Sequence, residues 1–133
     1  MALDAAIKSA LDTVPDCLAV GYIDMNTGML LEMQGESPAS VDVLETVSIA
    51  ISNLFQGHGV QAFEKLLAEA GDGAIDNAGF SEVTIFSGDH LFVFLKARDY
   101  QEHVVCFVCR GGANPGMVMA KSQMSLGKIA EAV

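Results

Sequence analysis

The hydrophobic positions of the chain separate it into helical and extended segments. Apolar residues recur at helical spacing over residues 3–14, and Pro15 ends the helix that they predict. Residues 17–23 and 29–33 are mostly apolar, and the turn-forming residues 24–28 lie between them. The first part of the chain therefore predicts a helix followed by a β-hairpin.

The middle of the chain predicts two helices and then a connector. A helix is expected over residues 41–56, with Ser40 as its N-cap. Residues 60–70 alternate apolar and polar positions in a way that indicates a further helix. Residues 71–79 are rich in glycine and acidic residues and are expected to form the connector to the next strand.

The last part of the chain predicts three strands and a final helix. The strands are expected at residues 81–86, 91–97 and 103–109, because short turn-like segments interrupt the apolar runs. The helix starts at about Met117, and the Asn114-Pro115 pair suits its N-cap and first helical position.

This order predicts an α+β fold: a five-stranded antiparallel sheet covered by helices on both faces, in the order αββαβββα, with an extra helical insert after the middle helix. Residues 18–23, 91–95 and 104–109 lack the alternation of a half-exposed strand, so both faces of these strands are expected to be buried. Residues 29–33 and 81–86 are more mixed and are expected nearer the edges of the sheet.

The helix predicted at residues 41–56 carries more apolar surface than packing on one sheet requires. Its apolar side chains fill an arc of about 180°, whereas an ordinary surface helix has a stripe of about 100°. Two interpretations stay open at this point. The extra surface either lies under the segment that follows or forms a contact with a second copy or a partner protein. The strand at residues 81–86 has one acid, no lysine and no proline, so its edge is open to pairing.

Composition narrows the classes of function. Hydrophobic residues make up 51% of the chain and charged residues 18%, which is typical of a folded protein, and residues 1–133 suit a single domain. The net charge of −10, with seven basic residues, disfavours binding to nucleic acid or to an anionic membrane surface. No apolar run approaches the roughly 18 residues of a membrane span, and the first residues lack the unbroken apolar stretch of a signal peptide. We therefore expect a cytoplasmic protein.

Candidate catalytic and metal-binding residues form no recognisable arrangement. Cys106 and Cys109 form a CxxC string inside a predicted strand, where this spacing places the two sulfurs on opposite faces, so buried, reduced cysteines are expected. The chain has no phosphate-binding loop of the GxxxxGK[ST] type, no histidine pair at metal-binding spacing and no serine in an arrangement that suggests activation. The sequence predicts neither an enzyme nor a bound metal or cofactor.

Two passages of the chain resemble the Roadblock family, which includes the dynein light chains and bacterial GTPase regulators and is related to profilin. Residues 14–24, VPDCLAVGYID, run into GMLL at residues 28–31 as a strand, a turn with an acid and a glycine, and a second strand. The second passage is NPGMV at residues 114–118, which opens the last helix. The resemblance extends over nearly the whole chain. The segment at residues 57–79 departs from it, because it is longer than the family usually has at this place.

The resemblance implies a non-enzymatic homodimer that binds or regulates a small Ras-like GTPase or another protein. In the family, the middle helix and the third strand build the dimer and the two sheets join edge to edge. The interface predicted in this way comprises Val43, Val47, Ala50 and Leu54 of the helix and Glu82, Val83, Thr84, Ile85 and Phe86 of the strand. The alternative hypothesis is a small-molecule sensor with a ligand pocket between sheet and helices, over which residues 57–79 could form a lid.

Overall fold

The computed structural model describes residues 2–70, 81–97, 100 and 102–133. The order of its elements is α1 (Ala2–Thr13), β1 (Cys17–Asp24), β2 (Met29–Gly35), α2 (Pro38–Gln56), α3 (His58–Ala70), β3 (Glu82–Ser87), β4 (His90–Lys96), β5 (His103–Arg110) and α4 (Pro115–Ala132). The predicted order is confirmed, including the helical insert after the middle helix. The connector predicted at residues 71–79 lies outside the described residues.

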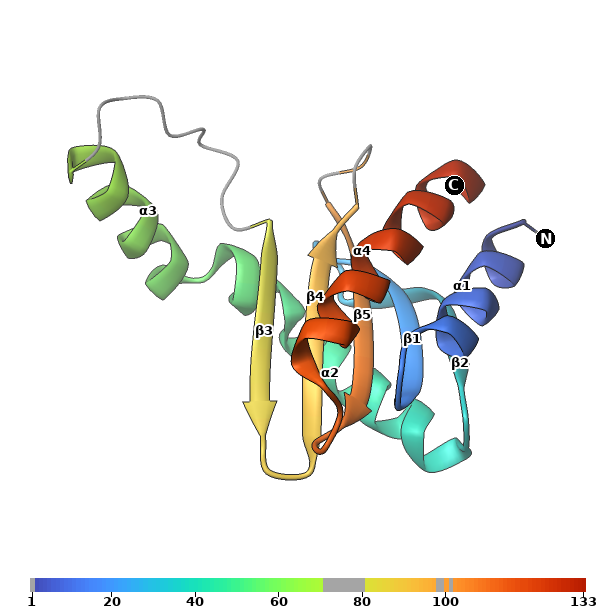
Figure 1. Ribbon diagram of the computed structural model, residues 1–133. Coiled ribbons are helices and arrows are strands. Elements are labelled where there is room, and N and C mark those ends of the chain that lie inside the picture. Colours follow the sequence, from blue (N-terminus) through green and yellow to red (C-terminus); the bar gives the residue numbers. More distant parts are fainter. Residues whose placement is uncertain (1, 71–80, 98–99, 101) are drawn as a thin grey trace.

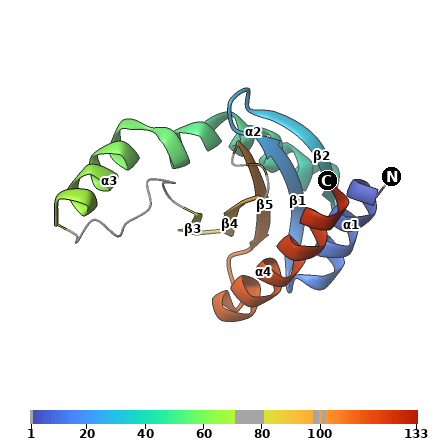
Figure 2. The same cartoon turned by 90° about the horizontal axis from the view of Figure 1, so that it is seen from above.

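The described strands form one antiparallel sheet in the order β2-β1-β5-β4-β3 (Figure 1). Helices α1 and α4 cover one face, and α2 covers the other (Figure 2). The central strands β1 and β5 are buried on both faces, as their unbroken apolar runs predicted, and β2 and β3 lie at the edges. The α+β fold class is therefore confirmed.

The cysteines of β5 show how the sheet divides the core into two layers. Cys109 packs with Phe107 and Val20 on the side of α1 and α4. Cys106 packs with Val108 and Leu44 on the side of α2. Side chains of a strand point alternately to its two faces, so a spacing of three places the two sulfurs in different layers, as predicted.

The start of α2 differs from the prediction. Ser37, and not Ser40, is the N-cap, and its hydroxyl oxygen accepts a hydrogen bond of 3.2 Å from the Ser40 backbone N–H. Pro38 opens the helix because its fixed φ suits the first turn, where its missing N–H costs nothing. The cap predicted for α4 is correct: the Asn114 side chain accepts from the Met117 backbone N–H at 3.2 Å.

One buried hydroxyl in α4 offers a test of the packing. Ser122 is 0% exposed, and its Oγ has no hydrogen-bond partner among the residues that the structure describes. A buried polar atom without a partner costs about 1–2 kcal/mol, and alanine is also the better helix former. We expect Ser122→Ala to raise the midpoint of thermal unfolding by about 3–5 °C.

The control for this substitution is a second buried serine that does have a partner. Ser48 in α2 donates a hydrogen bond of 2.8 Å to the Glu45 carbonyl oxygen. Ser48→Ala should therefore bring no gain in stability. Calorimetry of both variants checks the expectation, and an unchanged or lower midpoint for Ser122→Ala would contradict it.

Candidate interaction surface

One side of α2 is fixed by its packing on the sheet. Leu44, Ile51 and Phe55 are buried against the layer that contains Ile23 and Cys106. These side chains recur at the spacing of one helical face, so the sheet uses only a narrow part of the predicted apolar arc. The rest of the arc must lie beside the sheet contact.

The rest of the arc is a stripe beside this contact, made of the four helix residues predicted as interface. Val43, Val47 and Leu54 are half-buried, and Ala50 is exposed. Their spacing of i, i+4, i+7 and i+11 keeps them on one side of the helix, about 90° away from the buried side chains.

This stripe faces away from β2, toward the side of the sheet that carries β4 and β3. On the other side of α2, Gly28 lies beside Ser48 and Ile49, and Gly35 lies beside Val41, so β2 occupies that side. Among the described residues, α2 contacts β2, β1 and β5. The Phe55 ring of α2 also reaches β4, where it lies 5.9 Å from Lys96 Nζ, and it shares a core cluster with the buried Phe94. Farther along this side of the sheet, Phe92, Val83 and Ile85 are only partly buried.

Apolar side chains of β3 and β4 lie on the same side of the sheet as the stripe. Val83 pairs with Phe94 and Ile85 pairs with Phe92, so all four side chains point to the α2 side. Phe92 stacks on Phe94 with ring centroids 6.3 Å apart and an interplanar angle of 12°. Together these partly buried or exposed side chains form the open face: Val43, Val47, Ala50, Leu54, Val83, Ile85 and Phe92.

The other predicted residues of β3 lie on the opposite face of the sheet. Thr84 donates from Oγ1 to the Met119 sulfur at 3.4 Å, and the Glu82 carboxylate accepts a hydrogen bond from the Gln123 side chain. Phe86 is 66% exposed. The structure therefore places Val83 and Ile85 on the α2 side of the sheet, as it does the helix stripe, and places Glu82, Thr84 and Phe86 on the other side.

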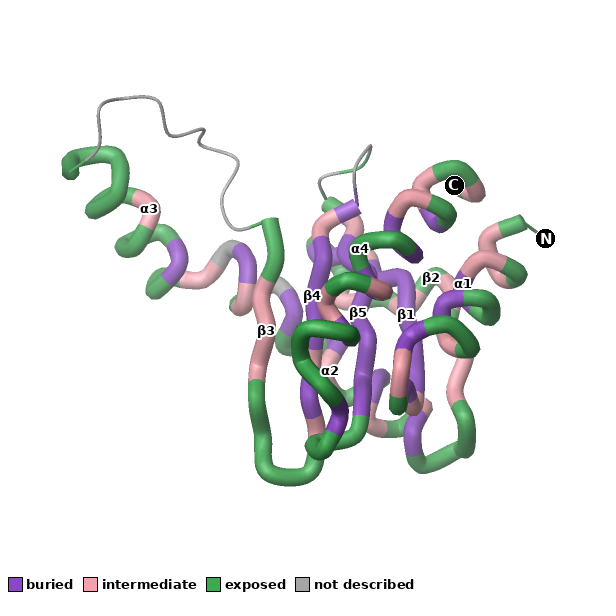
Figure 3. Tube along the Cα trace, viewed as in Figure 1, coloured by how far each residue is buried: buried purple, intermediate pink, exposed green. Residues whose placement is uncertain are grey.

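Glu82, Thr84 and Phe86 belong to the candidate site through their backbone groups. The Ser81 carbonyl accepts from the Lys96 backbone N–H at 3.0 Å, so the ladder with β4 uses residues 81, 83, 85 and 87. Glu82, Thr84 and Phe86 consequently direct their backbone N–H and C=O groups to the outer edge. No strand of the described chain lies beside that edge, called the free edge below. Figure 3 shows that β3 is far less buried than β4 and β5.

Sequence reasoning missed Phe92. It lies in the apolar run at residues 91–95, which lacks the alternation that would assign a face to each side chain. Its place in the open face depends on its pairing with Ile85, which the sequence did not reveal. A hydrophobic residue in a buried strand carries no signal of its own when its partner strand is unknown.

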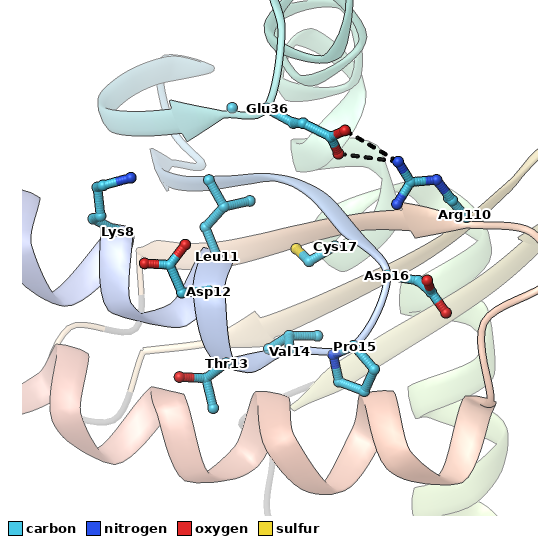
Figure 4. A pocket seen from close by; sticks show the side chains of 11 residues that line it. Lys8, Leu11, Asp12, Thr13, Val14, Pro15, Asp16, Cys17, Glu36 and Arg110 are labelled. Atoms are coloured by element: carbon cyan, nitrogen blue, oxygen red, sulfur yellow. Dashed lines mark hydrogen bonds and ion pairs between the residues drawn. The ribbon is translucent and has the colours of Figure 1, made fainter.

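A hollow of about 550 Å³ lies at a different place, between the end of α1, the start of β1 and the end of β2. Arg110 Nη2 donates to both carboxylate oxygens of Glu36 at 3.1 Å, and Figure 4 shows this pair on one side of the hollow. The two side chains are about half exposed, so the ion pair stabilises the fold weakly. The hypothesis of a ligand pocket expected residues 57–79 as a lid. Of these residues, 71–79 lie outside the described part of the chain, and helix α3 lies on the β3 side of the sheet, away from this hollow (Figure 1).

Tyr22, His103 and two of the cysteines are hydrogen-bonded or buried. Tyr22 Oη and His103 Nδ1 share a hydrogen bond of 2.9 Å. A hydrogen bond with Cys109, together with burial, raises the pKa of the Cys17 thiol, and burial raises the pKa of Cys106. Both groups are therefore neutral thiols at physiological pH. The described residues contain no cluster of histidine, cysteine and acidic side chains that could hold a metal ion.

Comparison with solved structures identifies the fold. The gliding protein MglB from Thermus thermophilus superposes with a TM-score of 0.72 at 16% identity, over 98% of this chain and 87% of that one. A Roadblock/LC7 domain from Streptomyces avermitilis gives a TM-score of 0.65 at 14% identity, over 98% and 97%. Profilin II from Acanthamoeba castellanii gives 0.53 at 16% identity, over 97% of each chain. The protein has the Roadblock fold, which is profilin-like.

No protein-family model matches the chain, and no curated protein matches it.

None of the described helices combines the length and the apolar character that crossing a bilayer requires.

Proposed function

We propose that the protein is a non-enzymatic homodimer that binds or regulates a small Ras-like GTPase, and that two copies join through the open face and the free edge. The observation that carries the proposal is that the edge strand contributes to the same apolar layer as the stripe. The α2 stripe, with Val47 at its centre, and the edge-strand residues Val83 and Ile85 pack against one core cluster. An unpaired strand edge beside an exposed apolar surface is suited to a second copy of the same chain.

The geometry of β3 favours one register for this contact. In antiparallel pairing about a two-fold axis at Thr84, the outward backbone groups of Thr84 meet those of the partner's Thr84, and Glu82 lies opposite the partner's Phe86. A two-fold axis at Glu82 would place two carboxylates opposite each other, which is destabilising. The axis at Thr84 keeps both α2 helices on the same face of a continuous sheet.

The GTPase part of the proposal comes from the resemblance to Roadblock proteins, whose members bind or regulate Ras-like GTPases. The acidic net charge of −10 suits a protein partner with a basic contact surface. Three buried, unpaired cysteines suit a reducing compartment, so the proposal places the protein in the cytoplasm.

Sedimentation equilibrium tests the dimer first. We expect a dimer at micromolar concentration, because a free edge and an open apolar face together provide an extended contact. A monomer at that concentration would contradict the proposal. The GTPase part is tested by immobilising the dimer and recovering partners from the native lysate in the presence of a non-hydrolysable GTP analogue or of GDP. A Ras-like GTPase that is retained in one nucleotide state is the expected result, and recovery of none would overturn that part.

A further inference from the structure

Cys17 and Cys109 lie directly opposite each other on neighbouring strands. Cys17 is the first residue of β1, and its Cα is paired with that of Cys109 in β5. Both side chains belong to the core layer on the side of α1 and α4, so they point to the same face of the sheet. The Cys17 thiol donates a hydrogen bond to the Cys109 sulfur. The fold thus brings two thiols from distant parts of the chain into contact.

The backbone ladder makes this pair a position that accepts a disulfide. The Arg110 backbone N–H donates to the Asp16 carbonyl oxygen at 3.0 Å, so the ladder bonds lie beside Cys17 and Cys109 and do not join them. The Cα atoms of such a pair are about 4.5 Å apart, at the short end of the range of about 4.4–6.8 Å that a disulfide spans. The two sulfurs can therefore be bridged without separating the strands. The short span strains the bridge and makes it easy to reduce.

The third cysteine is kept away from this pair. Cys106 and Cys109 form the CxxC string of the sequence, but Cys106 is 0% exposed in the core layer on the side of α2. The sheet itself lies between the two sulfurs of the string. The structure thus replaces the pairing that the string suggests with one between Cys17 and Cys109.

The pair can be reached from the hollow beside α1. Cys17 is 8% exposed and is one of the residues that line this hollow of about 550 Å³ (Figure 4). Cys109 lies behind it and is 0% exposed. The charged side chains of Lys8 and Arg110 at the hollow suit a small polar molecule.

We propose that Cys17 and Cys109 are a modification site, at which a hydroperoxide oxidises the two thiols to a reversible disulfide that joins β1 to β5. Hydrogen peroxide is the simplest oxidant of this class. The inference is independent of the proposed dimer, because both cysteines lie on the face of the sheet opposite to the open face.

The reaction balances with one peroxide for each pair of thiols. The hydrogen bond from Cys17 lowers the pKa of Cys109 against the effect of burial, so Cys109 supplies the thiolate. The thiolate attacks one peroxide oxygen, the O–O bond breaks, and the leaving hydroxide takes the proton of Cys17 to form water. The Cys17 sulfur then attacks the Cys109 sulfur, the S–O bond breaks, and the second hydroxide takes a proton from solvent. The two sulfurs lose two electrons, and the peroxide gains them.

Intact mass spectrometry of the full chain tests the site. The reduced protein is treated with a small excess of hydrogen peroxide, unfolded, and labelled with N-ethylmaleimide, which adds to every free thiol. We expect chains that have lost two hydrogen atoms and keep one of the three reactive thiols. Digestion should then yield a peptide pair that joins Cys17 to Cys109. Cys106 should be oxidised at least about tenfold more slowly than the pair.

Single substitutions and glutathione provide the controls. Cys106→Ala should form the bridge at the original rate, whereas Cys17→Ser and Cys109→Ser should each abolish the loss of two hydrogen atoms. Glutathione added after the peroxide should restore all three thiols, because a strained disulfide is readily reduced.

Three results would overturn the inference. The first is three free thiols after treatment, or added oxygen without the loss of a thiol pair. The second is a bridge that includes Cys106, since the sheet separates it from the other two sulfurs. The third is a bridge that glutathione does not open, because such a bridge would be permanent. None of these results bears on the proposed dimer, which sedimentation tests separately.

Discussion

Val47→Asp is expected to raise the dissociation constant of the dimer at least about a hundredfold. Val47 lies at the centre of the α2 stripe, between Val43 and Ala50 along the helix. Two-fold symmetry places one new carboxylate from each copy in the apolar contact, where an unpaired charge is costly. In the free monomer the half-buried position leaves the carboxylate access to water. The loss of folding stability should therefore stay near 1 kcal/mol.

The matched control for this change is Ile49→Asp. Ile49 lies two residues away on the same helix, is 79% exposed, and sits beside Gly28 on the side of α2 that faces away from the open face. Sedimentation velocity over a concentration series, with circular dichroism to monitor folding, compares the two variants. Equal effects of Val47→Asp and Ile49→Asp on association would show that the α2 stripe is not the contact.

Thr84→Pro is expected to weaken the dimer to a similar extent through the backbone. The Thr84 N–H points to the free edge and takes no part in the ladder with β4. Proline removes this donor at the centre of the proposed pairing, and its ring blocks the approach of a second strand. The monomer loses the contact between the Thr84 hydroxyl and Met119, which is a minor part of its packing. A folded monomer is the expected product.

Val83→Pro is the matched control, because it changes the edge of β3 that pairs with β4 and not the free edge. The Val83 N–H is directed to β4, opposite Phe94, and belongs to the ladder that holds β3 in the sheet. Proline there should lower the midpoint of thermal unfolding clearly, whereas Thr84→Pro should change it little. Size-exclusion chromatography with light scattering reports association. A Thr84→Pro protein that is folded and still dimeric at micromolar concentration would refute edge-to-edge pairing at β3.

The apolar pattern of the chain was sufficient to predict the order of elements, the central and edge strands and the presence of a helical insert. Boundaries were less well predicted where several residues suit the same role. Ser37 and Ser40 are both good N-caps, and Pro38 decides between them only once the helix is known to begin there. Strand β2 continues through Gln34 to Gly35 because its pairing with β1 extends that far, although the composition at this point is that of a loop.

The sequence by itself determined the α+β fold class, the excess apolar surface of α2 and the absence of lysine and proline from β3. Periodicity and composition are properties of single segments, so they can be read without the fold. Tertiary structure decided which surfaces meet. The register between β3 and β4 divides residues 82–86 between two faces and adds Phe92 to the open face. The direction in which α3 leaves α2 also depends on packing, and it places an amphipathic helix beyond the edge of its own sheet. Such adjacencies depend on pairings between distant segments, which no local pattern records.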